Sequence, residues 1–439
     1  MKVLKFGGTS VGSAQRMKEV AKLITDGERK IVVLSAMSGT TNTLVEISDY
    51  LYKKNPEGAN EIINKLESKY RQHIDELFAT PEYKQKGLEL IKSHFDYIRS
   101  YTKDLFTLFE EKVVLAQGEL ISTAMMNYYL QECGVKSVLL PALEYMRTDK
   151  NAEPDPVYIK DKLQVQLELH PDAEIYITQG YICRNAYGEI DNLQRGGSDY
   201  TASLIGAAIN ASEIQIWTDI DGMHNNDPRI VDKTAPVRHL HFEEAAELAY
   251  FGAKLLPPAC IQPAKYANIP VRLLNTMDPT APGTLISNDT EKGKIKAVAA
   301  KDNITAIKIK SSRMLLAHGF LRKVFEIFES YQTSIDMICT SEVGVSVSID
   351  NVKHLNEILD DLKKYGTVTV DKDMCIICVV GDLEWENVGF EAKALDAMRD
   401  IPVRMISFGG SNYNISFLIR ECDKKAALQS LSDALFNEE

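Results

Sequence analysis

The chain has 439 residues, which is too long for one compact core and, at roughly 150 residues per domain, indicates about three domains. Its 45% hydrophobic and 26% charged residues are typical of a globular protein, and no apolar run reaches the roughly 18 residues of a membrane span. The net charge of -12 repels phosphate backbones and anionic lipids, so we expect no nucleic-acid or membrane partner. An anionic substrate must then be held by a few local cations.

The N-terminal segment MKVLKFGGTS lacks the apolar region of a signal peptide, which favours a cytoplasmic location. The 7 Cys residues are an odd number scattered among apolar neighbours, as expected for free thiols in a reducing compartment. Cys375 and Cys378 form a CxxC in a strand-like run, where residues three apart point to opposite faces. We therefore expect no metal site there.

Residues 1–50 predict a βαβ unit. The strand VLKF (3–6) and a glycine turn precede a helix, and IVVLS (31–35) follows as a buried strand. From Thr43 to about Tyr129 the pattern is helical and strongly charged, which indicates a helical insertion. Its two apolar stripes are Ile62, Leu66 and Tyr70, and Leu88, Ile91, Phe95 and Ile98.

Strands are expected again at SVLL (137–140), EIYIT (174–178) and EIQIWT (213–218). Helices beginning near Ser198 and Glu243 alternate with them. This order favours a mainly parallel sheet covered by helices on both faces.

The composition changes at 276–296, which is rich in Pro, Gly, Asp and Lys and predicts a domain boundary. Beyond it, residues 319–350 and 389–420 repeat one plan, in which a Gly-Phe pair opens a helix and alternating strands follow. In the first copy, the expected apolar face of the helix is Leu321, Val324, Phe325 and Phe328. We interpret the repeats as two small βαββ modules.

The first candidate site is a lysine at the end of a strand, Lys5, followed by Gly7, Gly8 and Thr9. The segment lacks the lysine of a Walker loop and the GxGxxG of a dinucleotide fold. Bare backbone N–H groups next to a helix N-terminus favour phosphate binding. A tight turn with a solvated lysine is the alternative.

The second candidate is Arg195-Gly196-Gly197-Ser198-Asp199, where a guanidinium, a hydroxyl and a carboxylate flank bare amides. A planar Arg fork matches a carboxylate and an Asp can receive an ammonium, so the cluster suits a zwitterion. A helix capped by Ser198 is the alternative.

Weaker signals lie elsewhere. Asp219 and Asp221 follow the strand that ends at Thr218, which is consistent with a nucleotide or Mg²⁺ role or with an ordinary turn. Glu119 and Lys254 are single charged residues in apolar surroundings, where solvated or ion-paired side chains are common.

Taken together, these segments resemble the monofunctional aspartate kinases in order and spacing over essentially the whole chain. RGGSDYTA is the most specific of them, and the duplicated modules, with GFL (319–321) and DMICTSE (336–342), resemble tandem ACT regulatory modules. His224 departs from the family, where Tyr is frequent beside the nucleotide. The segments are KFGGTSVG (5–12), AQGELIS (116–122), LQRGGSDYTA (193–202), WTDIDG (217–222) with NDPR (226–229), and FGAKLLPP (251–258).

The resemblance implies an α/β amino-acid-kinase fold, a mainly parallel sheet sandwiched by helices with a helical insertion, followed by two ferredoxin-like βαββ ACT modules. The expected domains are a catalytic domain at 1–290 with its insertion at about 50–112, a first ACT module at 300–370 and a second at 371–439. In one arrangement the second module borrows a strand from about 296–312.

The resemblance implies the ATP-dependent phosphorylation of the side-chain carboxylate of L-aspartate, which commits it to lysine, threonine and methionine synthesis. Mg²⁺ would be held mainly through the ATP phosphates. The implied catalytic residues are Lys5, Asp199 and Lys254; the substrate-binding residues are Thr41, Glu119, Arg195 and Ser198; the ATP-binding residues are Lys5, Gly7, Gly8, Thr9, Thr218, Asp219, His224, Arg229 and Lys254.

The resemblance also implies feedback by lysine, with threonine as the alternative, and a homodimer or homotetramer assembled through the ACT modules. The implied effector residues are Met314, Phe320, Ser334, Ile335, Asp336, Thr340 and Ser341. The alternative is that Asp336 is a solvated charge at a strand edge and that the modules only dimerise. Two other functions stay open, another amino-acid carboxylate kinase of the same fold and a non-catalytic amino-acid sensor.

Overall fold

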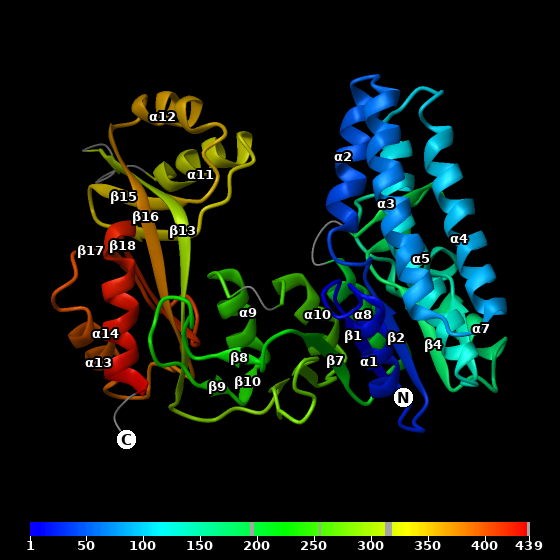
Figure 1. Ribbon diagram of the computed structural model, residues 1–439. Helices are drawn as coiled ribbons and strands as arrows, with labels where there is room; N and C mark the ends of the chain where they lie inside the picture. The colour runs from blue at the N-terminus through cyan, green and yellow to red at the C-terminus, as the bar shows by residue number, and fades with distance from the viewer. Residues whose placement is uncertain (194–196, 254–255, 312–317, 437–439) are drawn as a thin grey trace. The chain divides into compact units, whose positions relative to one another are not determined.

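The computed structural model describes residues 1–193, 197–253, 256–311 and 318–436 (Figure 1). The chain forms two compact units, Met1–Met223 with Leu256–Asn288, and His224–Leu255 with Asp289–Glu439. The break at Asp289 falls inside the segment whose composition changes. The grouping of residues 224–255 with the C-terminal part was not expected from the sequence.

The first unit is built on a sheet with the strand order β12-β11-β7-β1-β2-β4-β3. All pairs are parallel except β11 with β12, so the prediction of a mainly parallel sheet is confirmed. The strands are β1 (Lys2–Phe6), β2 (Lys30–Leu34), β3 (Ser137–Leu140), β4 (Ile175–Gln179), β7 (Ile214–Thr218), β11 (Val271–Asn275) and β12 (Thr284–Ser287), with shorter strands β5 (Ile182–Arg184), β6 (Ile190–Asn192) and β8 (Met223–His224).

Alternation along β1 decides which side chains face which helices. Leu4 and Phe6 belong to the large core that also contains the apolar stripes of the insertion. Lys5 therefore points to the opposite face, which α8 covers. The helices of this unit are α1 (Ala14–Ile24), α2 (Thr40–Tyr52), α3 (Pro56–Leu77), α4 (Pro81–Ser100), α5 (Leu108–Glu132), α6 (Ala142–Tyr145), α7 (Pro156–Glu168), α8 (Gly197–Ile209) and α10 (Pro258–Tyr266).

The helical insertion consists of α2, α3, α4 and α5 packed side by side (Figure 1). Most residues of the predicted stripes lie in its core, and Tyr70, Ile91, Phe95 and Ile98 are completely buried. Ile62 and Leu88 are only partly buried and pack against that core. Proline opens α3 and α4, where its missing N–H is not needed, and Thr107 begins α5 with a capping box.

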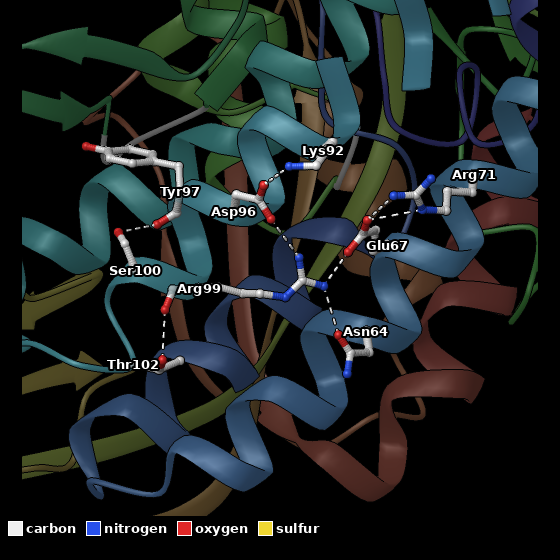
Figure 2. A network of polar contacts seen from close by, with 9 residues as sticks. All are labelled: Asn64, Glu67, Arg71, Lys92, Asp96, Tyr97, Arg99, Ser100 and Thr102. Atoms are coloured by element: carbon white, nitrogen blue, oxygen red, sulfur yellow. Dashed lines mark hydrogen bonds and ion pairs between the residues drawn. The ribbon is translucent and has the colours of Figure 1, made fainter. Parts of the chain in front are cut away.

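A polar network joins α3 to α4 beside this core (Figure 2). Glu67, only 8% exposed, accepts from Arg71 of its own helix and from Arg99 of α4. Arg99 also donates to Asn64 and contacts Asp96. Two guanidinium groups thus compensate one buried carboxylate, which stabilises the helix pair in one register.

Replacing Glu67 by Gln is expected to lower the free energy of unfolding at pH 7 by about 1 to 3 kcal/mol, because both arginines lose a charged acceptor. Burial raises the pKa of Glu67, but hydrogen bonds from Arg99 and Arg71 outweigh burial and hold it below the usual range. Such a carboxylate stabilises the fold above its unfolded pKa of about 4.3, and this contribution is lost as the pH falls through the lower folded value. Urea unfolding at pH 7 and near pH 3 should show the difference closing in acid.

Glu61→Gln on the same helix is the control, since Glu61 pairs with Lys65 where both side chains are about two thirds exposed. Its urea midpoint should match the wild type. An equal loss in the two variants would contradict a special role for the network.

The second unit contains a sheet of order β14-β15-β13-β16-β18-β17. Its strands are β13 (Ile295–Lys310), β14 (Met337–Thr340), β15 (Gly344–Ile349), β16 (Thr367–Gly381), β17 (Val403–Ser407) and β18 (Asn414–Arg420), with short β9 (Pro236–Val237) and β10 (His239–His241). Its helices are α9 (Phe242–Tyr250), α11 (Phe320–Ser330), α12 (Leu355–Lys363), α13 (Phe390–Ala397), η2 (Glu421–Asp423) and α14 (Lys424–Phe436).

The two predicted repeats are present as α11-β14-β15 and α13-β17-β18, but they share two long strands. The second half of β13 pairs with β15 in one module, while the first half pairs with the end of β16, whose other neighbour is β18. Accordingly Ile307 lies in the core of the first module and Val298 in that of the second. The predicted boundary at 370/371 falls within β16, and the segment at about 296–312 that was expected to lend a strand covers most of β13.

One detail of the predicted core of α11 is wrong. Val324 and Phe328 are buried, but Leu321 and Phe325 are 37% and 42% exposed. Phe320 and Ile327 occupy the core positions instead. The helix is rotated by about one residue relative to the prediction, because Phe320 directly follows the turn at Gly319 and starts the buried face.

Among the described residues, no helix has the length and apolar character needed to cross a membrane. Cys375 and Cys378 are free and buried, and burial raises the pKa of each thiol. The described residues contain no cluster of His, Cys, Asp and Glu that could hold a metal ion.

Candidate active site

Lys5 and Asp199 form a largely buried ion pair at the carboxyl ends of the parallel strands. Lys5 is the residue before the end of β1, and Asp199 lies in the first turn of α8. The Nζ and Oδ1 atoms are 2.7 Å apart, and the side chains are 11% and 16% exposed. This edge of an open parallel sheet is where ligands bind, so the ammonium is placed to meet an anion.

The glycine turn after β1 packs directly on the loop after β2. A Cβ atom at Gly8 would lie 2.8 Å from the carbonyl oxygen of Ala36, so only glycine fits. Ser38 N donates to Gly8 O at 3.1 Å, which ties the two loops together. Gly7 stays open, since a Cβ there would meet only Lys5 Nζ, at 3.5 Å. The turn leaves room for a ligand beside the lysine.

The loop after β2 leads into α2 at the same edge. Gly39 precedes the helix with a φ of +83° and supplies no side-chain cap. Backbone oxygens accept from the start of the helix instead, since Thr40 N donates to Met37 O at 3.0 Å and Thr43 N to Gly39 O at 3.1 Å. Thr40 is buried and shares a 2.8 Å hydrogen bond with the hydroxyl of Tyr70 in the insertion. The insertion therefore supports the start of α2 and the neighbouring Thr41.

Glu119 is a buried carboxylate on α5 that faces the same loop. Its Oε1 accepts from Ala36 N at 3.2 Å, whereas Oε2 is buried and has no hydrogen-bond partner within the described residues. Burial raises the pKa of Glu119 to about 7, against the lowering effect of the Ala36 N–H. Gly118 permits this placement, because a Cβ there would lie 2.7 Å from that of Ala36. A ligand ammonium would satisfy the open oxygen.

The first turn of α8 is held against the strand ends by close packing. A Cβ atom at Gly180, just after β4, would lie 2.3 Å from Ser198 Oγ. Ser35 Oγ donates to Ser198 Oγ at 2.9 Å. Ser198 thus serves as a bridge between loops, and its role as a simple helix cap is not needed to explain it.

These elements enclose a pocket of about 400 Å³. Four predicted site residues contribute to it, Gly8, Thr41, Glu119 and Ser198, together with Gly197. Its size is within the range of small-molecule sites, and its polar groups are hydroxyls, backbone amides and one carboxylate. The remaining lining residues are Ser35, Ala36, Met37, Ser38, Gly39, Asn42 and Tyr181.

The other predicted residues of this group either have contacts elsewhere or fall outside the described part of the chain. Arg195 and Lys254 lie outside the described residues. Thr218 ends β7, where its carbonyl accepts from Thr276 N at 2.8 Å, and Asp219 is exposed. In the second unit, the ring of His224 contacts Thr234 at 2.9 Å, and Arg229 pairs with Asp227 at 2.7 Å.

Sequence reasoning missed Tyr181, which lines the pocket after β4. Its φ of +68° is unusual for a residue with a large side chain, and burial raises the pKa of its hydroxyl to about 12. The backbone N of Tyr181 donates to Thr201 Oγ1 at 3.0 Å, which holds this conformation. The strand end at Gly180-Tyr181 was a usable signal of position, but the sequence does not reveal the strained backbone.

The predicted effector residues are divided between core and surface. Phe320 is buried in the core of the first module, Ser334, Thr340 and Ser341 are exposed, and Ile335 packs against that core. Met314 lies outside the described residues. Asp336 is no solvated edge charge, since its side chain is 1% exposed and pairs with Lys301 at 2.7 Å.

Comparison with known proteins agrees with this architecture. Residues 1–275 match the amino acid kinase family and residues 377–435 match an ACT domain. The chain is 35% identical to aspartokinase 1, chloroplastic, of Arabidopsis thaliana, over 99% of this chain and 80% of that protein.

Two crystal structures of aspartokinase III of E. coli are also similar. The R-state complex with aspartate and ADP is 31% identical, with a TM-score of 0.85 over 99% of this chain and 100% of the other. The T-state complex with lysine and aspartate is 32% identical, with a TM-score of 0.80 over 99% of each chain. The two-unit fold and the Lys5–Asp199 pair agree with these matches, which extend over nearly the whole chain. The chain therefore belongs to the aspartokinases of the amino acid kinase family.

Proposed function

We propose that this chain transfers the γ-phosphoryl group of ATP to the side-chain carboxylate of L-aspartate, giving 4-phospho-L-aspartate and ADP. The observation that carries the proposal is the combination of the Lys5–Asp199 pair with the open, buried oxygen of Glu119 beside the pocket. The first provides a cation for a phosphoryl group, and the second provides an anion for the ammonium of an amino acid. The related E. coli enzyme has been crystallised with aspartate and ADP.

The difficulty of this reaction is electrostatic. The side-chain carboxylate of aspartate, with a pKa near 3.9, is ionised at pH 7 and needs no general base. It must approach a triphosphate while charge develops on the bridging oxygen, so cations and backbone donors provide the catalysis. In this proposal Lys5 and Lys254 neutralise the transferring group and the leaving oxygen, and Gly7, Gly8 and Thr9 hold the phosphates. In the same proposal Mg²⁺ would be held mainly through the ATP phosphates.

Substrate recognition follows from the polar groups around the pocket. Glu119 and Asp199 receive the ammonium, and Arg195 binds the α-carboxylate through its planar fork. Thr41 and Ser198 complete the pocket with hydroxyl groups. On the nucleotide side, the proposed contacts are Thr218, Asp219, His224 and Arg229.

Arg195→Lys is expected to raise the KM for aspartate by at least about tenfold with little change in the KM for ATP, because Lys keeps the charge but loses the bidentate geometry. Steady-state kinetics with each substrate varied in turn measures the contrast. If both constants rise together, Arg195 serves the phosphates.

A substrate panel tests the proposed function itself. Purified protein, MgATP and single amino acids are incubated with hydroxylamine, which converts an acyl phosphate to a coloured hydroxamate. Hydroxamate with aspartate alone supports the proposal, and a preference for glutamate would indicate another carboxylate kinase of this fold. A protein that forms none with any amino acid, but binds one of them, would be a sensor.

Regulation and assembly are part of the proposal. The ACT modules receive a free amino acid, lysine first and threonine second, at the strand and turn that contain Asp336 and Ser341, and they join copies of the chain into a dimer or tetramer. The lysine complex of the related E. coli enzyme supports the first point. The seven free cysteines support a reducing, cytoplasmic location. The catalytic domain at 1–290 and modules at 300–370 and 371–439 remain our assignment of boundaries.

A further inference from the structure

Two residues from distant parts of the second unit share one oxygen of Asp336. Tyr250, the last residue of α9, donates its hydroxyl to Asp336 Oδ1 at 2.8 Å. Lys301 of β13 donates from Nζ to the same oxygen at 2.7 Å. The Asp336 side chain is only 1% exposed, so these two donors take the place of water around its carboxylate. Asp336 therefore joins β14 to both α9 and β13.

The other oxygen of Asp336 is open. Oδ2 is buried and accepts no hydrogen bond within the described residues. A buried carboxylate oxygen without a donor is unfavourable, and an ammonium group would satisfy it. The regulation proposed above brings a free amino acid to this strand, and the present inference rests on that proposal. Its ammonium would donate to Oδ2, since the hydrogen bonds of Tyr250 and Lys301 both go to Oδ1.

Lys301 also pairs with a second carboxylate, that of Asp350. Its Nζ lies 2.9 Å from Asp350 Oδ2, and it also sits 4.5 Å from the ring centroid of Tyr250. A second ammonium on Asp336 repels Lys301, and Asp350 can hold Lys301 after such a shift. The change affects two contacts of Tyr250, namely the hydrogen bond from its hydroxyl to Asp336 and the contact of its ring with the Lys301 cation.

The segment after Tyr250 leads directly to a proposed catalytic residue. Phe251, Gly252 and Ala253 separate Tyr250 from Lys254. Gly252 has a φ of +108°, and a Cβ atom there would lie 2.2 Å from the carbonyl oxygen of Ala300, the residue before Lys301. Tyr250 and Gly252 thus fix the end of α9 to one place on β13. A shift of Lys301 would therefore also change the position of this segment.

We infer that Tyr250 couples the effector site to the end of α9. An amino-acid ammonium at Asp336 Oδ2 displaces Lys301 and weakens the hydroxyl contact of Tyr250, and the end of α9 transmits this change to residues 251–253. The ligand binds one arrangement of these contacts better than the other, which is the condition for allosteric control. Tyr250 is a coupling residue and touches neither substrate.

The test is Tyr250→Phe in the full-length protein, which removes the hydroxyl and keeps the ring. L-lysine binding is measured by calorimetry, and inhibition by phosphoryl-transfer rates at saturating lysine. We expect a rate without lysine within twofold of wild type and a Kd for lysine within about threefold. Inhibition by saturating lysine should fall from at least tenfold to less than threefold.

Tyr331→Phe is the matched control, because the hydroxyl of Tyr331 donates to Asp361 Oδ2 at 2.8 Å in the same unit. It should keep full inhibition. Unchanged inhibition in Tyr250→Phe overturns the inference, and so does an equal loss in Tyr331→Phe, which would indicate general loosening of the unit. If the wild type phosphorylates aspartate but binds none of lysine, threonine and methionine, the inference fails while the kinase function stands. A wild type without turnover refutes the proposed function instead.

Discussion

Lys5→Met is expected to lower the kcat of aspartate phosphorylation by at least about a hundredfold. One preorganised donor directed at developing charge contributes roughly 3 to 4 kcal/mol, and Met keeps the length of the stem while removing the ammonium. The ion pair with Asp199, 2.7 Å from Nζ, fixes the position of the Lys5 ammonium. Initial rates at saturating ATP and aspartate measure the loss, and circular dichroism should show a retained fold.

Lys2→Met on the same strand is the matched control. Lys2 pairs with Glu28 at 2.8 Å, but the two side chains are 37% and 57% exposed, so the pair contributes little. Turnover should stay within twofold of the wild type. Normal turnover in Lys5→Met would mean that the glycine turn and its lysine are structural.

Glu119→Gln is expected to raise the KM for aspartate by about 10- to 100-fold, equivalent to the roughly 1.5 to 3 kcal/mol of a hydrogen bond to a charged group. The substitution also changes the pH profile. Because burial raises the pKa of Glu119 to about 7, the free enzyme is increasingly protonated below that pH and receives an ammonium poorly. In the wild type, kcat/KM for aspartate should fall as the pH drops below 7, and in Glu119→Gln this inflection should disappear.

Glu111→Gln, near the start of the same helix, should keep both the inflection and the KM, since Glu111 accepts from Tyr52 and is not among the residues that line the pocket. The KM for ATP should change little in either variant. An inflection near pH 7 that persists in Glu119→Gln would assign it to another group and remove Glu119 from substrate binding.

The sequence was most informative where one physical pattern dominated. Continuous apolar runs such as IVVLS, closed by a glycine or polar turn, predicted the parallel strands, because such a strand is buried on both faces. The repeated Gly-Phe turns predicted the two modules. The exposed face of α11 was misjudged, since Leu321 and Phe325 fit the helical period as well as Phe320 and Ile327 do. Period alone does not fix the rotation of a helix.

For the site, residue type and chain order predicted which side chains lie near the strand ends, but not their partners. The buried position of Glu119 depends on Gly118 packing against Ala36, 82 residues away in sequence. Tyr181 was missed because its strained backbone is imposed by tertiary contacts. Likewise, Asp336 was predicted to receive an ammonium, yet nothing local to it indicates that Lys301 and Tyr250 already hold one of its oxygens.

The sharing of β13 and β16 by the two modules has a consequence for how the second unit can change in evolution. A gene cut between residues 370 and 371 would divide β16 (Thr367–Gly381) and leave the first half of β13 without its partner. Each fragment would then present a row of unsatisfied backbone N–H and C=O groups, an edge that recruits strands from other chains. We therefore expect either copy of the duplication to aggregate when it is expressed alone, and we expect the two copies to be inherited together.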